Sequence, residues 1–334
     1  MAFGANLHVA QALTDLAVAY KPSADGFLRD KFFARKAVQH LSDKLRQIST
    51  ANALLLHDLK VGADGRVPEV QYRIDSDLSY VCKPYANEVV VDDLDSGNAD
   101  AALAHEQRLF DQGMLSLTIA LEYEAIKNTL RDTAILTANE TMAAADRWDN
   151  YTSTSSDPIN DLLQACTLVR HQTGKNVNRI AMEEWSFNKM QSHPNVLDRV
   201  RLTGGPGAVL TTGILAGILR VDESSILITS QSYNSAVMSA TISRKSFLGS
   251  DVVVAYCEDG GLYDFGLGHE FAFSGYGAEP AVVVKYRDDK RGVLGSNVIR
   301  VGSIVDFKVT NASAAYLFKG VLDTTNAEYG SFLD

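Results

Sequence analysis

The sequence is poor in the residues that mark metal centres and disulfide frameworks. It holds 3 cysteines and 7 histidines in 334 residues. Cys82, Cys166 and Cys257 are far apart, and no two histidines stand at the spacing of metal ligands. An odd, sparse cysteine count favours reduced thiols and folding in a cytoplasm. We therefore predict no metal site and no disulfide framework.

The motifs of common enzyme classes are also absent. The glycine cluster before Ala208 lacks the lysine of a phosphate-binding loop, and no Gly-x-Ser-x-Gly, His-Glu-x-x-His or complete dinucleotide fingerprint occurs. Glu183 and Glu184 are adjacent, so their side chains diverge on a helix, and we interpret them as acids of a first helical turn. We predict no catalytic and no cofactor-binding residue. A soluble α/β hydrolase or transferase with dispersed catalytic residues stays open as an alternative.

Positive charge is in the minority. The 31 basic residues face 41 acidic ones, which gives a net charge of −10. This balance argues against a surface built to grip nucleic acid or anionic lipid. No apolar run approaches the length of a membrane span, and the first residues lack the pattern of a signal peptide. We therefore expect neither a membrane protein nor an exported one.

One basic segment is the exception. Between Lys21 and Arg46 there are 7 basic and 3 acidic residues. Apolar residues at helical spacing predict an amphipathic helix over Phe27–Ile48. Its basic side is either an ordinary solvated face or a contact for a polyanion or an acidic partner. The candidates for such a contact are Arg29, Lys31, Arg35 and Lys36.

A long helix is predicted over Ala99–Thr137. Its apolar stripe passes onto an adjacent face after Leu121, no proline interrupts it, and Gly113 is its weak point. Some 35 residues at 1.5 Å each make a helix about 50 Å long, which exceeds the diameter of a small domain. We interpret it as a spine along which an extended protein is built. The stripe comprises Leu103, Phe110, Met114, Leu117 and Leu121.

The stretch Leu59–Asp95 changes to a period of two. Val70, Tyr72 and Ile74 alternate with polar residues, and a second arm follows Asp77. The pattern predicts a long two-stranded arm. An isolated hairpin is marginally stable in water, so we expect this one to lie on something else, such as another subunit.

From Asp157 onward, helices alternate with short strands. Asp157-Pro158 predicts a capped helix start and Gly174 its end, followed by a strand over Arg179–Met182 and a helix up to Met190. Further short elements surround a flexible loop, Thr203–Thr212. This alternation indicates an α/β layer.

The last part is rich in strands. Ala281–Arg287, Val298–Val301, Ile304–Val309 and Ala314–Lys319 read as antiparallel strands. No helix follows to cover them, so we expect the spine helix to do so. Residues 99–137 and 270–320 would then form one discontinuous domain around the α/β insertion.

This order of elements resembles that of the major capsid proteins of tailed bacteriophages. The most telling stretch is Asp157–Arg199, with a helix, a glycine, an Asn-Arg strand, a tryptophan helix, His-Pro and a terminal Asp-Arg. Tyr80–Asp93 is similar to the end of the family's extended loop, Gly213–Ser230 to its next unit and Ala281–Leu322 to its closing strands. The resemblance covers most of the chain from about residue 58 onward.

The resemblance implies an α+β fold with four parts. These are an N-terminal arm with the basic helix (1–57), an extended β-hairpin loop (58–95), a peripheral domain of spine helix and long strands (96–151 and 262–334), and an axial α/β domain (152–261). The extended loop would contact a neighbouring subunit, and the loop at 203–212 would lie at the centre of hexamers and pentamers. The implied contact residues are Arg66, Tyr72, Arg73, Tyr80, Lys83, Gly204, Gly205, Pro206 and Gly207.

The implied function is structural. Many copies would close into an icosahedral shell around packaged double-stranded DNA, assembled in the cytoplasm of a bacterial host. The expected partners are the chain itself, a scaffolding protein, a portal and a decoration protein, with DNA contacted non-specifically and no membrane involved. An encapsulin-like compartment, which has the same fold but encloses cargo proteins, stays open as an alternative.

Overall fold

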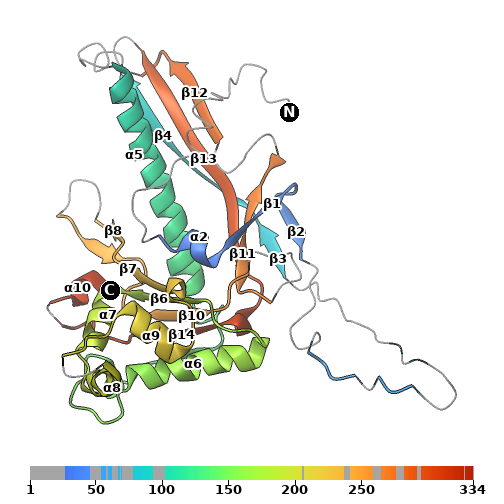
Figure 1. The fold of residues 1–334 in the computed structure, drawn as a ribbon. Coiled ribbons are helices and arrows are strands. Elements are labelled where there is room, and N and C mark those ends of the chain that lie inside the picture. The colour runs from blue at the N-terminus through green and yellow to red at the C-terminus, as the bar shows by residue number, and fades with distance from the viewer. Residues whose placement is uncertain are drawn as a thin grey trace.

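We describe a computed structural model of the chain (Figure 1). It describes residues 27–45, 54–57, 59–61, 67, 69, 78–92, 102–204, 207–236, 241–258, 265–275, 282–291, 295–326 and 328–333. Helices and strands are mixed, as expected for an α+β protein. No helix in these ranges is long and apolar enough to cross a membrane.

The first sheet surrounds one long strand. β13 (Ser296–Val309) pairs antiparallel with β11 (Gly268–Phe273), β12 (Val282–Asp288) and β4 (Lys83–Asp92), and β1 (Ala34–Val38) adds a parallel edge beside β11. Figure 1 shows α5 (Ala102–Glu122) running along this sheet. The spine helix therefore covers the long strands, as expected.

The spine is shorter than predicted and changes its winding. After Glu122 the chain continues as a π-helix, η1 (Tyr123–Leu130), so the helical run ends at Leu130 and not at Thr137. The predicted stripe is confirmed for Phe110, Met114, Leu117 and Leu121, which are all buried. The side chain of Leu103 lies outside the described part of the chain.

The second sheet forms a separate layer with its own core. Its strand order is β5 (Asn139–Thr141), β14 (Ala315–Lys319), β10 (Val252–Ala255), β6 (Arg179–Glu183) and β7 (Ile226–Thr229). Its helices are α6 (Pro158–Thr173), α7 (Glu184–Gln191), α8 (Pro194–Gly204) and α9 (Thr212–Leu219). One face of these strands packs with these helices into a second core, and the other face, with Ala181, Val253 and Leu317, belongs to the core under α5.

The predicted start and end of α6 are confirmed. The Asp157 side chain accepts a hydrogen bond from the N–H group of Asn160, and Pro158 occupies the first turn. Gly174 ends the helix in the left-handed conformation, with φ 70°. The predicted strand and helix that follow, now β6 and α7, also form within one or two residues of expectation.

Small elements complete the fold. Two short ribbons pair β2 (Ser42–Lys44) with β3 (Ser79–Val81), and β8 (Ser232–Asn234) with β9 (Arg244–Ser246). The other short helices among the described residues are α2 (Arg29–Phe32), η2 (Glu223–Ser225), η4 (Ala312–Ala314) and α10 (Gly330–Leu333).

The amphipathic helix predicted over Phe27–Ile48 is wrong. Only α2 is helical, and the chain then extends into β1 and β2, while residues from 46 to 48 lie outside the described part. In β1 burial alternates residue by residue because its five residues pair with His269–Phe273 of β11. This pairing joins positions more than two hundred residues apart, so local spacing could not reveal it.

The two-stranded arm is also corrected in part. Val70, Tyr72 and Ile74 lie outside the described residues. The second arm does not stand free, because β4 pairs with β13 over ten residues and packs against α5. Residues 83–92 are therefore part of the subunit's own first sheet.

The late strands divide differently from expectation. The segments Val298–Val301 and Ile304–Val309 are one continuous strand, β13. Strand β14 pairs with β10 and β5 in the second sheet and not with β12 and β13. The chain thus leaves the first sheet after Val309 and ends in the second layer.

Candidate functional site

An extended segment carries the largest group of exposed apolar side chains among the described residues. Figure 1 shows residues 54–57 and 59–61 well away from both sheets. Leu56 is 95% exposed. Clustered apolar surface of this kind marks an interaction site in soluble proteins. The exposed members are Leu54, Leu55, Leu56, Leu59, Val61 and Val67.

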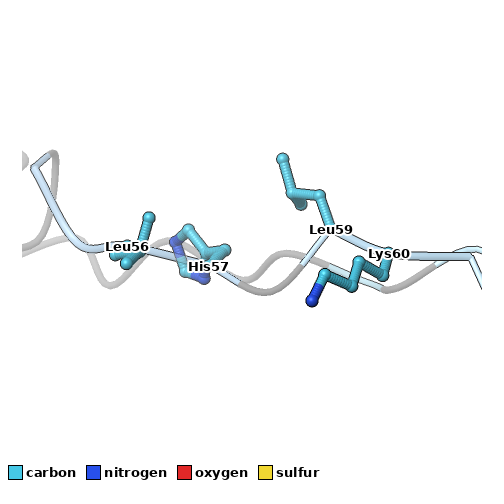
Figure 2. Close-up of a pocket in the computed structure, with 4 residues that line it drawn as sticks. All are labelled: Leu56, His57, Leu59 and Lys60. Atoms are coloured by element: carbon cyan, nitrogen blue, oxygen red, sulfur yellow. The ribbon is translucent and has the colours of Figure 1, made fainter.

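A shallow groove of about 530 Å³ lies on the same segment. Figure 2 shows its lining side chains, Leu56, His57, Leu59 and Lys60, along one run of chain. All four come from neighbouring positions, so within the described part of the chain no second element closes the groove over a small ligand. The segment therefore has the character of a contact surface and not of an enclosed substrate pocket.

The predicted contact residues of the extended loop divide into three cases. Arg66, Tyr72 and Arg73 lie outside the described residues. Lys83 is exposed, with its Nζ 3.8 Å from Glu124. The prediction that Tyr80 contacts a neighbouring subunit is wrong, because Tyr80 is buried inside its own subunit.

The packing of Tyr80 explains this outcome. Its ring stacks on Phe271 with centroids 4.8 Å apart, in a small core that also contains Leu45 and Cys82. Burial raises the pKa of the Tyr80 hydroxyl. A ring enclosed in this way is not available to a neighbouring subunit.

The predicted glycine loop follows the second layer's helix α8. Gly204 is the last residue of α8, Gly205 and Pro206 lie outside the described residues, and Gly207 is exposed with φ 94°. Leu202 is 86% exposed at the end of the same helix. Val209, inside the predicted loop at 203–212, is also exposed, so apolar surface lies on both sides of the loop's glycines.

The basic candidates do not form one free cationic face. Arg29 and Arg35 each lie 3.5 Å from the buried carboxylate of Glu270. Lys31 is exposed and Lys36 is half-buried. Removing either arginine would therefore leave a buried carboxylate with less compensation, which costs stability whatever else the arginine does.

The buried histidine His193 does not activate a nucleophile. Its Nδ1 accepts a hydrogen bond from the N–H group of Asn195, so the neutral ring carries its proton on Nε2, 3.1 Å from Ser156 Oγ. Ser156 Oγ in turn donates to the carbonyl oxygen of Arg147 at 2.9 Å. Burial lowers the pKa of His193. A ring that donates to a hydroxyl group cannot take the proton of that hydroxyl group.

The other candidate residues, possible metal ligands and the adjacent acids Glu183 and Glu184, do not form a reactive site either. Within the ranges described, no group of three His, Cys, Asp or Glu side chains is placed to hold a metal ion. Glu183 is buried and accepts a hydrogen bond from the N–H group of Trp185 at 2.6 Å, while Glu184 is exposed. Glu184 is a first-turn acid, as interpreted, whereas Glu183 ends β6 and caps α7, so the two acids do not converge on a site.

Sequence reasoning missed the apolar flanks of both contact surfaces. Leu54–Leu56 precede the segment in which the arm was expected, and Leu202 lies beside, and Val209 within, the loop at 203–212, which was characterised by its glycines. A signal for the first group was present, because three consecutive leucines stand where no helical or strand period continues.

Comparison with known proteins gives a fold but no sequence family. No protein family model matches the chain, and no curated protein matches its sequence. Among solved structures, a phage-related protein from Bordetella bronchiseptica matches with a TM-score of 0.71 at 19% identity, over 94% of this chain and 98% of that one.

Two further matches indicate what this fold is. The capsid of the cyanophage P-SCSP1u matches with a TM-score of 0.56 at 10% identity, over 90% of this chain and 89% of that one. The SrpI encapsulin of Synechococcus elongatus matches with a TM-score of 0.50 at 11% identity, over 95% and 96% of the two chains. The chain therefore has the capsid fold of tailed phages, which encapsulins share.

Proposed function

We propose that the chain is a capsid protein, the subunit of a closed protein shell, and that residues 54–67 lie on a neighbouring subunit. The observation that carries this proposal is the group of exposed apolar side chains held away from the subunit's own sheets. Burying one leucine or valine stabilises an assembly by about 1.5–3 kcal/mol. Six such side chains exposed in the isolated chain favour a form in which another copy covers them.

The shell requires no single strong contact. Each subunit of a closed symmetric assembly is held by several neighbours at once, so individually weak contacts add up to a stable particle. We place the exposed flanks of the glycine loop, Leu202 and Val209, at a second contact between copies. That contact is the proposed centre of hexamers and pentamers.

We further propose that the shell encloses double-stranded DNA in a virion assembled in the host cytoplasm, with a scaffolding protein, a portal and a decoration protein as partners. The fold match to a phage-related protein is better than the match to an encapsulin, with TM-scores of 0.71 and 0.50. The net charge of −10 suits a shell whose inner surface does not bind DNA tightly.

A second candidate, an encapsulin-like compartment, is favoured by the same fold match over 95% of the chain. Particles isolated from the organism that carries the gene distinguish the two. After nuclease treatment, a phage shell retains long double-stranded DNA of uniform length. An encapsulin-like shell retains a defined cargo protein and no such DNA.

The DNA or scaffold contact of the basic segment is best tested through its lysines. Changing Arg29 or Arg35 would disturb the pairing of Glu270, so loss of assembly would not separate contact from folding. The double variant K31A/K36A avoids those pairs. We expect it to fold normally and to give fewer filled particles, and an unchanged yield of filled particles would contradict a role in contact.

The shell proposal is tested by placing charge on the exposed apolar segment. We expect the double variant L56D/L59D to remain folded but to sediment as small species under conditions in which the unchanged chain forms capsomers or shells. The matched control is L168D, at an exposed leucine of α6 in the second layer. If L56D/L59D assembles as well as L168D does, the proposed contact is wrong.

A further inference from the structure

The chain changes its pairing partner at Cys82, between β3 and β4. Strand β4 pairs with β13, and its first residue, Lys83, lies opposite Val305. One residue earlier, the N–H group of Cys82 donates instead to the carbonyl oxygen of Leu41, at 2.8 Å. The preceding strand, β3, pairs with β2. At Cys82 the chain therefore branches from the first sheet into the β2–β3 ribbon.

This ribbon carries both ends of the proposed contact segment, residues 54–67. Strand β2 ends at Lys44 and β3 begins at Ser79, so residues 45–78 form one connection between the two strands. Figure 1 shows the ribbon on the same side of the body as the described part of the contact segment. The direction of the ribbon therefore sets where the contact segment leaves the subunit.

Three consecutive residues at this branch contact one pair of residues in the first sheet, which we call the anchor pair. The anchor pair is Phe271 of β11 and Asp306 of β13, which lie opposite each other. The ring of Tyr80 stacks on Phe271. The N–H group of Val81 donates to Oδ2 of Asp306 at 2.9 Å. The thiol group of Cys82 donates to the carbonyl oxygen of Phe271 at 3.5 Å.

Asp306 makes the directional contact of the anchor pair. A two-stranded ribbon is marginally stable by itself, so its placement depends on how it is attached to the sheet. A stacked ring can slide over its neighbour, and a thiol group is a weak donor. The hydrogen bond from Val81 to the half-buried carboxyl group of Asp306 instead fixes both a distance and a direction.

We propose that Asp306 is a positioning residue for assembly, whose hydrogen bond to Val81 fixes the ribbon on the first sheet and so directs the contact segment toward a neighbouring subunit. The hold on the ribbon is a property of the single chain, whereas the effect on assembly rests on the proposed function. Loss of this bond should leave the first sheet intact, because β4 pairs with β13 over ten residues without it.

The first test is hydrogen exchange of individual amides, measured by NMR in the unassembled full-length chain. The variant D306A removes the acceptor. The amides of Leu45 and Cys82 report on the ribbon, since they donate to Leu78 and Leu41. We expect both of these amides and that of Val81 to exchange about fivefold faster or more, and the amides of β4 to keep their rates. Faster exchange of Val81 alone, or no change, would overturn the proposal.

Two further variants separate the hydrogen bond from a general loss of stability. D306N keeps a side-chain oxygen that accepts from Val81, so it should restore slow exchange in the ribbon. D132A is the matched control, because Asp132 also accepts a hydrogen bond from a backbone N–H group, that of Ala134 at 2.8 Å, but lies after η1. It should leave the ribbon unchanged. If D306A does not fold, D306T replaces it, since a threonine hydroxyl group is too short to reach Val81.

The second test is assembly of the same variants, measured by sedimentation. We expect D306A to yield fewer closed shells than the unchanged chain, and D306N and D132A to assemble normally. If D306A loosens the ribbon but assembles as well as the unchanged chain, the positioning role is wrong although the shell proposal stands. An unchanged chain that forms no shells contradicts the proposed function, and the assembly role of Asp306 with it.

Discussion

Two glycines inside helices show how one residue type serves opposite purposes. A Cβ atom on Gly113 of α5 would lie 2.7 Å from a methyl carbon of Val89 on β4. The carbonyl oxygen of Gly113 accepts a hydrogen bond from Asn87 of the same strand at 2.7 Å. A Cβ atom on Gly217 of α9 would meet nothing within 4 Å. Gly113 therefore permits close packing of helix on sheet, whereas Gly217 only weakens its helix.

We predict opposite effects of alanine at these two positions. G113A should lower the free energy of unfolding by about 1 kcal/mol, because overpacking against the stiff side chain of Val89 outweighs the gain in helix propensity. G217A should raise it by about 0.5–1 kcal/mol. Urea denaturation of the purified variants measures both. Equal shifts of the same sign would contradict the proposed role of Gly113.

Residues that act locally could be predicted, and residues that act across the sheet could not. Asp157 and Gly174 bound α6 through contacts within a few positions, so their sequence pattern was sufficient. Gly302 falls between two segments, Val298–Val301 and Ile304–Val309, that were predicted as separate strands. It lies instead in the middle of β13, where a Cβ atom would come within 3.0 Å of the side chain of Ala86 on β4. The requirement for a residue without a side chain at this position becomes visible only once the pairing of β4 with β13 is known.

At the scale of elements, the carboxylate of Glu88 links three strands of the first sheet, β4, β12 and β13. Glu88 of β4 accepts hydrogen bonds from Arg300 of β13, at 2.5 Å, and from Tyr286 of β12, at 2.9 Å. Arg291, in the turn between β12 and β13, adds a third at 3.0 Å. These hydrogen bonds, that of Arg300 first, lower the pKa of Glu88 to about 2.

We predict that the contribution of Glu88 depends on pH. Because its pKa is lowered, its stabilisation is complete above about pH 4.5 and is lost as the pH falls toward 2. E88Q should cost up to about 1 kcal/mol at pH 7, since the side chain is partly exposed, and the difference from the unchanged chain should shrink by pH 3.

Denaturation at several pH values measures that difference. The control is D289N, at a carboxylate that pairs with Arg287 in the same turn but is 83% exposed. Its effect should stay below about 0.5 kcal/mol at every pH. A cost of E88Q that is constant from pH 7 to pH 3 would show that the ionised form of Glu88 is not what stabilises the sheet.

Among elements, self-contained helices were predicted well and strands with distant partners poorly. The elements between Asp157 and Leu219 depend on caps and local periodicity, and they form close to their expected positions. The stretch after Phe32 has apolar residues at helical spacing but becomes β1 because the edge of β11 is available to it. Tertiary pairing overrides local preference there.

At the scale of the whole molecule, the second sheet lies between two cores, one shared with the spine and one shared with helices α6 to α9. Arg131, just after η1, lies 2.6 Å from the buried carboxylate of Asp251, which also accepts a hydrogen bond from the N–H group of Gly320 between β14 and the C-terminal residues. Among the described residues, the most exposed apolar side chains include those of residues 54–56, 59, 61 and 67 and Leu202 beside the loop at 203–212. The order of elements predicted this architecture. Which strand pairs with which sheet could not be predicted from it.

The central claim is that other copies of the chain cover this uncovered surface. Electron microscopy of the purified full-length chain, with reconstruction of the particles, tests it most directly. We predict closed shells in which Leu56 and Leu59 of each subunit are buried against a neighbour. A chain that stays monomeric at high concentration, or shells in which residues 54–67 face solvent, would contradict the account.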